Sequence, residues 1–293
     1  MRIVKLFEEK EFVYSFEIFP PKPVYPIDSV YSTIDELSKL KPDFISVTYG
    51  AGGSITNNRT AEIASIIKNK YSIEALAHLT CVNSTKEQIN HVINDLKEKG
   101  IENILALRGD IIEGGEPLGI FKNSQDIIRF AKANSDFGIS AASYPEGHME
   151  SKDKSIDIEI LKLKEEAGAD HFVSQVFFDN KYFYELLNKA EQKGVKSPIQ
   201  AGVMPVVNKK QIERIISLSG CSIPEKFIKI INKYEHDKEA LRDAGIAFAL
   251  DQIVDLISSG VKGVHLYTMN NPYIAKIITN SISSIANNVN SKN

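Results

Sequence analysis

The chain has 293 residues, a length that suits one α/β barrel, since that fold commonly needs roughly 250 residues. Its net charge of -3 provides no basic surface for a nucleic acid, and its two cysteines, Cys81 and Cys221, are too few for a disulfide framework or a CxxC metal site. No window reaches the ~18 uncharged apolar residues of a membrane span, and the first residues lack the apolar stretch of a signal peptide. We therefore expect one cytoplasmic domain over residues 1–293, with no nucleic-acid partner, no membrane partner and no metal.

Short apolar runs alternate with longer amphipathic segments along the chain, which is the pattern of β-α units around a parallel sheet. The pattern predicts strands near residues 13–18, 44–48, 74–79, 103–107, 139–143, 171–176, 199–203 and 263–267. It predicts helices near residues 29–40, 58–69, 85–99, 124–134, 154–168, 181–193, 208–219 and 271–285. An additional helical segment over 224–258 lengthens the seventh unit, and the polar tail over 287–293 is expected to fray.

Helix-end signals agree with several of these boundaries. Ser84 and Glu87 have the spacing of a capping box, and Asn208 and Gln211 repeat it. Eight such units without a linker predict a (β/α)8 TIM barrel with an extra helical segment before the eighth strand. A doubly wound sheet is the competing fold, but Pro20-Pro21 stands where its glycine fingerprint would follow the first strand.

The active sites of such barrels lie at the carboxyl ends of the strands. Glu17 lies inside the apolar first strand, where a carboxylate is costly to bury unless it is paired or exchanges a proton. The other strand ends carry Thr48-Tyr49-Gly50, His78-Leu79-Thr80, Arg108-Gly109-Asp110, Ser143-Tyr144-Pro145, Gln175, Met204-Pro205 and Tyr267-Thr268.

Common catalytic motifs are absent from the sequence. HExxH, CxxC, Walker A, GxGxxG and GxSxG do not occur, and no strand end supplies the lone lysine of a barrel aldolase. The residues alone therefore predict a site that grips a large polar cofactor or conjugated ring and uses one carboxylic acid. They leave the reaction open.

A series of motifs, in order along nearly the whole chain, resembles the methylenetetrahydrofolate reductase family. The motifs occupy residues 15–22 (SFEIFPPK), 46–50 (SVTYG), 77–81 (AHLTC), 105–110 (LALRGD), 144–148 (YPEGH), 167–170 (AGAD), 175–179 (QVFFD) and 266–270 (LYTMN). The resemblance implies a barrel flavoprotein that holds noncovalent FAD and forms homo-oligomers. It also implies ping-pong hydride transfer from NADH or NADPH, through FAD, to 5,10-methylenetetrahydrofolate, which yields 5-methyltetrahydrofolate for methionine biosynthesis.

The resemblance also implies roles for individual residues. Glu17 would be the general acid that opens the methylene-bridged ring, with a raised pKa, and Asp110 would tune the flavin potential and contact the pterin. The expected FAD contacts are Thr48, His78, Arg108, Gly109, Asp110, Ala142, Tyr144, His148, Asp157 and Lys164. The expected substrate contacts are Glu17, Gln175, Gln211 and Tyr267.

Structural interpretations compete with several of these roles. Glu17 could belong to a buried ion pair, Asp157 and Lys164 could form a solvated helix face, and Gln211 could serve only in its capping box. His78 could be a satisfied core histidine, and Asp110 a turn residue.

The sequence departs from the family pattern at three places. Ile215 replaces a phenylalanine that stacks on NADH in some members, Asn271 replaces an arginine near the folate tail, and the loop over 111–117 differs. These departures keep open a folate-binding subunit of a larger reductase complex, served by an electron-transfer partner protein. A pterin-dependent methyltransferase without FAD is the other alternative.

Overall fold

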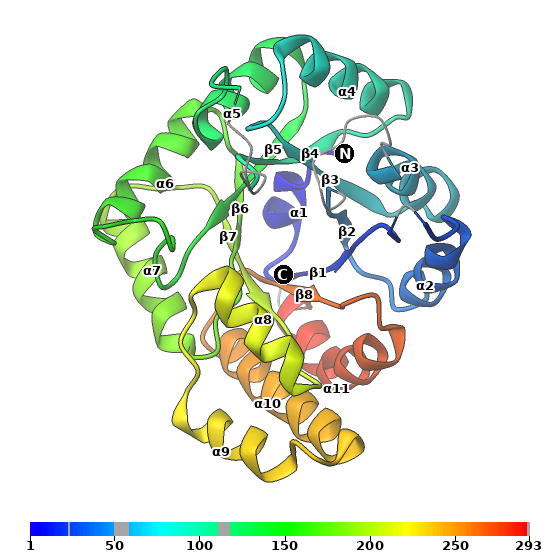
Figure 1. The fold of residues 1–293 in the computed structure, drawn as a ribbon, viewed down its shortest axis with the longest axis vertical. Helices are drawn as coiled ribbons and strands as arrows, with labels where there is room; N and C mark the ends of the chain where they lie inside the picture. Colours follow the sequence, from blue (N-terminus) through cyan, green and yellow to red (C-terminus); the bar gives the residue numbers. More distant parts are fainter. Residues whose placement is uncertain (23, 50–58, 111–117, 292–293) are drawn as a thin grey trace.

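Eight parallel strands close into a barrel in chain order, and β8 pairs with β1 to complete it (Figure 1). The computed structural model describes residues 1–22, 24–49, 59–110 and 118–291. The strands are β1 (Val13–Ile18), β2 (Phe44–Val47), β3 (Glu74–Thr80), β4 (Asn103–Leu107), β5 (Gly138–Ser143), β6 (His171–Ser174), β7 (Ile199–Val203) and β8 (Gly263–Tyr267). The predicted barrel is confirmed. One strand end differs, because β6 stops at Ser174 and leaves Gln175 in the loop that follows.

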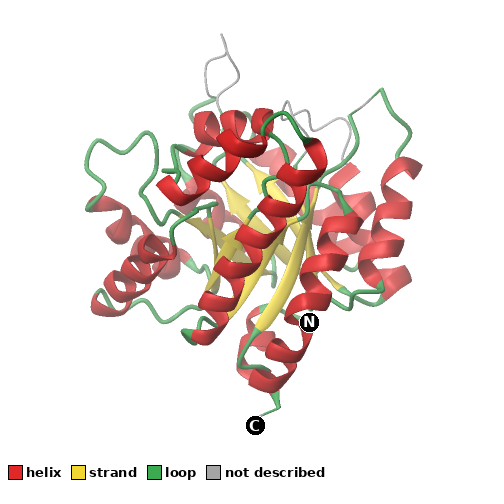
Figure 2. Cartoon of the chain, turned by 90° about the horizontal axis from the view of Figure 1, so that it is seen from below, coloured by secondary structure: helices red, strands yellow, loops and turns green. Residues whose placement is uncertain are grey.

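Helices follow the strands and surround the barrel, as Figure 2 shows. They are α2 (Asp28–Ser38), α3 (Arg59–Tyr71), α4 (Lys86–Glu98), α5 (Ser124–Asn134), α6 (Ile156–Ala167), α7 (Asn180–Gln192), α8 (Lys209–Ser219) and α11 (Pro272–Asn290). Their apolar faces have helical spacing: α4, for example, buries Ile89, Val92, Ile93 and Leu96. The main core lies between the strands and these helices. Each apolar side chain buried there contributes about 1.5–3 kcal/mol.

The segment over 224–258 forms two helices rather than one. These are α9 (Glu225–Tyr234) and α10 (Lys238–Ser258), and the break occurs at Asp237. The Asp237 carboxylate accepts hydrogen bonds from the backbone N–H groups of Glu239 and Ala240, which starts α10 afresh. The sequence pattern predicted a helical segment here but did not reveal the N-cap at Asp237 that divides it into two helices.

Two further predictions of helix ends need correction. The capping box of α4 is formed by Thr85 and Gln88, one residue later than the Ser84 and Glu87 spacing indicated. The tail does not fray from residue 287, because α11 continues to Asn290. The Asn290 amide accepts a hydrogen bond from Phe12 N–H and donates one to Phe12 C=O, and these bonds tie the last turn to the barrel. By contrast, the Asn208 cap is confirmed.

A short helix that the sequence did not predict, α1 (Val4–Glu9), lies across the amino-terminal end of the barrel (Figure 1). Ile3 and Leu6 pack there against apolar side chains of the strands, among them Val13 and Phe44. The Asn103 amide fixes this segment, since it accepts from Ile3 N–H and donates to Met1 C=O. With this end covered, the carboxyl ends of the strands remain for a ligand site.

Glu165 on α6 connects this outer helix to the start of β7 through hydrogen bonds. Its carboxylate accepts hydrogen bonds from the N–H groups of Lys196 and Ser197, just before β7, and pairs with Lys162. Burial alone would raise the pKa of Glu165, but these donors outweigh burial and lower the pKa to about 2.

We expect Glu165→Gln to lower the free energy of unfolding at pH 7 by roughly 2–3 kcal/mol. Because the folded pKa lies below the unfolded one, this stabilisation is complete above about pH 4.5 and is lost as the pH falls toward 2. Urea unfolding between pH 3.5 and 7 should therefore show the two proteins converging. The exposed neighbour Glu166 gives the control, since Glu166→Gln should change stability by less than about 0.5 kcal/mol. A gap that stays constant with pH would contradict the assignment.

Candidate functional site

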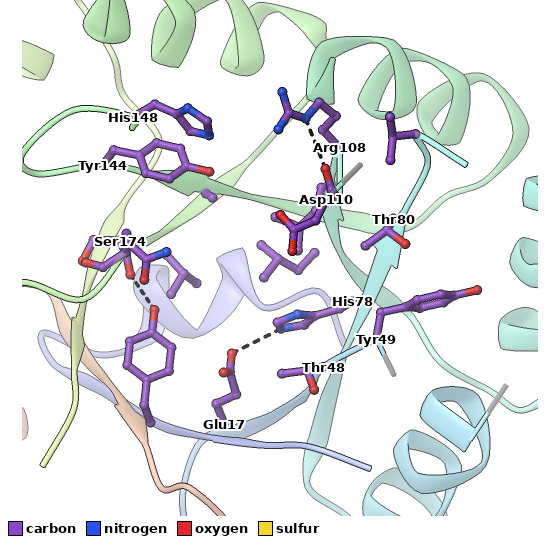
Figure 3. A pocket seen from close by; sticks show the side chains of 18 of the residues that line it. Glu17, Thr48, Tyr49, His78, Thr80, Arg108, Asp110, Tyr144, His148 and Ser174 are labelled. Atoms are coloured by element: carbon purple, nitrogen blue, oxygen red, sulfur yellow. Dashed lines mark hydrogen bonds and ion pairs between the residues drawn. The ribbon is translucent and has the colours of Figure 1, made fainter. Parts of the chain in front are cut away.

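A pocket of about 570 Å³ lies at the carboxyl ends of the strands (Figure 3). Side chains from β1, β3, β4, β5, β6 and β8 converge on it, together with residues of the loops after β2, β3, β4, β5 and β6. The predicted site residues that line it are Glu17, Thr48, His78, Arg108, Gly109, Asp110, Ala142, Tyr144, His148, Gln175 and Tyr267. Gly50 and the loop over 111–117 lie outside the described residues.

A second hollow, of about 370 Å³, shares Arg108, Tyr144 and His148 with the first as common walls. It contains both remaining predicted cofactor residues, Asp157 and Lys164, and reaches the first turn of α5. The two hollows therefore form one elongated site. Its length runs from the floor of the barrel mouth to the space between α5 and α6.

Glu17 lies at the floor of the first pocket, where three elements meet its carboxylate. Ser46 on β2 donates a hydrogen bond to Oε2 at 3.4 Å. His78 on β3 points toward the same carboxylate in Figure 3, with Nε2 3.4 Å from Oε2. His265 Nε2 on β8 lies 3.7 Å away. About a fifth of the Glu17 side chain remains exposed, so this pairing leaves the carboxylate accessible from the pocket.

The ionisation of Glu17 differs from the sequence prediction. Burial would raise the pKa of Glu17, but the neighbouring imidazoles of His265 and His78 outweigh burial and lower the pKa to about 2. The expected raised pKa is therefore wrong for this arrangement. The apolar run around Glu17 is visible in its own strand, whereas the two imidazoles come from strands far away in the sequence.

Arg108 stands between the two hollows and holds Glu150 in its guanidinium fork. Its Nη1 donates to Glu150 Oε2 at 2.6 Å and its Nη2 to Oε1 at 2.9 Å. The next residue, Gly109, has φ of +84°, and a Cβ there would lie 2.9 Å from Thr80 Cβ. Only glycine suits this turn. It places exposed Asp110 at the rim of the pocket.

Lys164 is a buried cation, only 5% exposed, on the inner face of α6. Its Nζ donates to Ala142 C=O at 2.7 Å and lies 5.4 Å from the centre of the Tyr144 ring. Burial lowers the pKa of Lys164 to about 8, against the opposing charge of Asp157. The Asp157 carboxylate accepts from His148 N–H at 2.9 Å. The interpretation of Asp157 and Lys164 as a solvated face is therefore wrong.

Gln211 lies outside both hollows. Its side chain accepts from Val207 N–H and donates to Pro205 C=O, while its own N–H binds the Asn208 side chain. These are the contacts of a helix cap. Its role as a substrate contact stays a prediction.

The two departures from the family pattern have structural positions of their own. Ile215 on α8 is buried in a small apolar core that also contains Phe227 of α9. Asn271 is the N-cap of α11, where its side chain accepts from Ile274 N–H.

The sequence reasoning gave no role to Ser46, His265 and Ser174, although all three belong to this site. Ser46 and His265 touch Glu17, and Ser174 C=O accepts the Tyr267 hydroxyl at 2.7 Å. Alternation along β2 and β8 could have indicated the first two, since inward positions recur at every second residue.

The family model described as methylenetetrahydrofolate reductase matches residues 2–283. The chain belongs to the methylenetetrahydrofolate reductase family. The 5,10-methylenetetrahydrofolate reductase of Pectobacterium carotovorum is 35% identical over 269 residues, which cover 92% of this chain and 89% of that protein. That of Escherichia coli is 34% identical and covers 92% and 90%.

Other relatives of the methylenetetrahydrofolate reductase family differ more in length. Methylenetetrahydrofolate reductase (NADH) 1 of maize is 35% identical, over 88% of this chain but only 46% of its own length. Among solved structures, an uncharacterized Clostridium thermocellum protein that binds two copies of 5-methyl-5,6,7,8-tetrahydrofolic acid aligns with a TM-score of 0.66. It covers 96% of this chain and 97% of its own at 13% identity, so this likeness concerns the fold.

The described residues contain no group of three or more His, Cys, Asp or Glu side chains placed to hold a metal ion. None of their helices combines the length and the apolar character that crossing a membrane requires.

Gly202 on β7 provides a test of how the pocket wall is built. A Cβ on this residue would lie 2.3 Å from Ser174 C=O and 2.7 Å from the Tyr267 hydroxyl. We expect Gly202→Ala to break the Tyr267–Ser174 hydrogen bond and to lower the free energy of unfolding by about 1–3 kcal/mol. Urea unfolding measures this cost.

Tyr267→Phe is the matched variant, because it removes the hydrogen bond without a clash and should cost about 1 kcal/mol. The alanine substitution should cost less in the Tyr267→Phe background than in the wild type, since one of the clashing atoms is gone. Additive costs would contradict the proposed contact.

Proposed function

We propose that this chain reduces 5,10-methylenetetrahydrofolate to 5-methyltetrahydrofolate, with noncovalent FAD as cofactor and NADH or NADPH as its reductant. Relatives that cover nearly the same length carry the name of this activity, and a plant relative is named as NADH-dependent. The observation that carries the proposal is the placement of Glu17. One accessible carboxylate lies at the floor of a pocket that continues into a hollow suited to a dinucleotide.

The second hollow fits the polar part of FAD by the chemistry of its donors. Lys164 is a buried cation, and among the described residues its Nζ has one hydrogen-bond partner, the Ala142 carbonyl, so a phosphate would complete its coordination. The first turn of α5 adds the backbone N–H groups of Ser124 and Gln125 at a helix N-terminus. Asp157 offers an acceptor for a ribose hydroxyl. When bound, the flavin would take hydride from the nucleotide and pass it to the folate.

Glu17 would donate a proton to a nitrogen of the methylene bridge, which opens the bridged ring and makes its carbon electrophilic. With a pKa of about 2, Glu17 is an anion at neutral pH and must first gain that proton. A pterin ring over the pocket floor would remove water from the carboxylate. Desolvation already pushes the pKa of Glu17 upward, so we propose that substrate binding raises it toward neutrality.

The reductant and the assembly state stay predictions. Ile215 is buried and gives no stacking surface on α8, so the identity of the donor (NADH, NADPH or an electron-transfer partner protein) rests on kinetics. A homo-oligomer is likewise a proposal from the resemblance. A methyltransferase is the weaker alternative, because it needs no hollow for a dinucleotide.

Anaerobic stopped-flow tests the proposed function through the visible absorbance of the flavin. We expect NADH or NADPH to bleach it and methylenetetrahydrofolate to restore the colour. Glu17→Gln should keep the bleaching and lose the folate step by about 100-fold or more, because a positioned acid typically contributes 10²–10⁴. A colourless protein that binds no flavin would refute the proposal, as would full folate turnover by Glu17→Gln.

Asp110 gives a second test, because its carboxylate lines the pocket. A negative charge there disfavours the anionic reduced flavin. Asp110→Asn should raise the two-electron midpoint potential by about 10–30 mV, where 30 mV corresponds to about 1.4 kcal/mol. Glu98→Gln is the control, since Glu98 is exposed at the carboxyl end of α4, far from the strand ends that carry the pocket. Equal potentials for wild type and Asp110→Asn would remove the tuning role.

A further inference from the structure

A chain of buried polar side chains runs through the barrel interior beneath Glu17. Gln200 Nε2 on β7 donates to Ser15 Oγ at 2.9 Å, and Ser15 Oγ lies 2.6 Å from His265 Nδ1. His265 Nε2 lies 3.0 Å from Ser46 Oγ, which donates to the Glu17 carboxylate. Gln200, Ser15, His265 and Ser46 are fully buried, so this chain has no contact with solvent except through Glu17.

The hydrogen bonds of this chain have one consistent direction. Gln200 Nε2 also faces the carbonyls of Val13 and Val264, which only accept, so the amide nitrogen is placed there and Ser15 accepts from it. The Ser15 hydroxyl then donates to His265 Nδ1, which is its remaining hydrogen-bond partner among the described residues. An accepting Nδ1 places the ring proton on Nε2.

The second half of the chain follows from that tautomer. Nε2–H of His265 donates to Ser46 Oγ, and the Ser46 hydroxyl is left to donate to Glu17. Every donor therefore points toward the carboxylate. A carboxylate that accepts oriented hydrogen bonds is stabilised as the anion.

We propose that His265, held by Ser15 and Gln200 as its neutral Nε2–H tautomer, orients the Ser46 hydroxyl toward Glu17 and thereby sets the acid strength of that carboxyl. The proposal rests on the proposed function of Glu17 as proton donor. His265 reaches the reaction only through other residues, so it is a positioning residue. Its contribution is to let Glu17 release a proton to a weakly basic nitrogen and to stabilise the anion that remains.

The other groups around this chain agree with a neutral His265. Phe44 stacks on its ring with centroids 5.7 Å apart, and burial lowers the pKa of His265. His78 faces Glu17 from β3, and His171 on β6 is a further titratable neighbour, while the Tyr267 hydroxyl turns away to Ser174 C=O. Among these, His265 is the ring that joins Glu17 to the barrel interior.

His171 is a matched control inside the same barrel. It is also fully buried, and its Nδ1 is paired with a serine, Ser140, at 2.8 Å. Its Nε2 makes no hydrogen bond to a carboxylate among the described residues. Replacing His171 therefore imposes a similar packing loss and removes a neighbour of Gln200, but it leaves the contacts of His265 with Ser15 and Ser46 in place.

Infrared difference spectra against Glu17→Gln identify the Glu17 carboxylate band and follow its titration in the purified full chain, without substrate. Wild-type Glu17 should stay ionised at pH 4, whereas His265→Leu and Ser46→Ala should raise its titration midpoint by about one to two pH units. His265→Gln, which keeps an amide donor for Ser46, should recover most of the wild-type behaviour, and His171→Leu should leave the midpoint in place. An ionised carboxylate at pH 4 in His265→Leu, or an equal change in His171→Leu, would overturn the proposal.

Stopped-flow kinetics separate this proposal from the function on which it rests. In His265→Leu the folate step should show a lower plateau at low pH, because Glu17 is a weaker acid, and its falling limb should move to higher pH by the same one to two pH units. Reduction by the nucleotide should be unchanged. A moved titration with no folate step in the wild type would refute the function and keep the positioning role. A working folate step in the wild type, with no change in the Glu17 titration in His265→Leu, would keep the function and refute the positioning role.

Discussion

The pairing of β8 with β1 is the constraint on which the site depends. In this register Glu17 stands opposite Tyr267 on one side and opposite Ser46 of β2 on the other. His265 lies two residues before Tyr267 and so shares its inward face. A slip of one residue would turn His265 outward and leave the Glu17 carboxylate without the donors of β8. Closure of the barrel and the acidity of its central carboxyl are thus set by the same hydrogen-bond ladder.

The inside of this barrel is more polar than its fold requires. Its interior holds Ser15, Ser46, His171, Gln200 and His265, all fully buried, where branched apolar residues fill many barrels. Buried polar groups cost free energy unless each is hydrogen-bonded. Mutual pairing limits this cost, although His171 Nε2 and Gln200 Oε1 have no hydrogen-bond partner among the described residues. Most apolar burial occurs in the outer layer of helices. The interior can therefore serve the site because the outer layer stabilises the fold.

The sequence was sufficient for features that depend on local pattern. Alternating apolar runs placed all eight strands, and their ends converge on the pocket as the barrel rule requires. Features that depend on contacts across the barrel were not accessible in this way. The pKa of Glu17 is decided by His78 and His265, which lie 61 and 248 positions further along the chain. In the same way, the last turn of α11 is held by Phe12, near the other end of the chain.

The two ends of the elongated site have opposite electrostatic character, and this difference orients a ligand. At one end the buried Lys164, with its pKa lowered by burial, gains most from a group that brings negative charge. At the other end Glu17 is an anion and repels such a group, but accepts a neutral ring that can take a proton. Arg108 stands between the two ends with its fork on Glu150, a side chain that is 61% exposed. An anionic ligand that reaches Arg108 would compete with this exposed carboxylate for the guanidinium fork. The charges therefore favour a ligand with its phosphates between α5 and α6 and its ring over the mouth of the barrel.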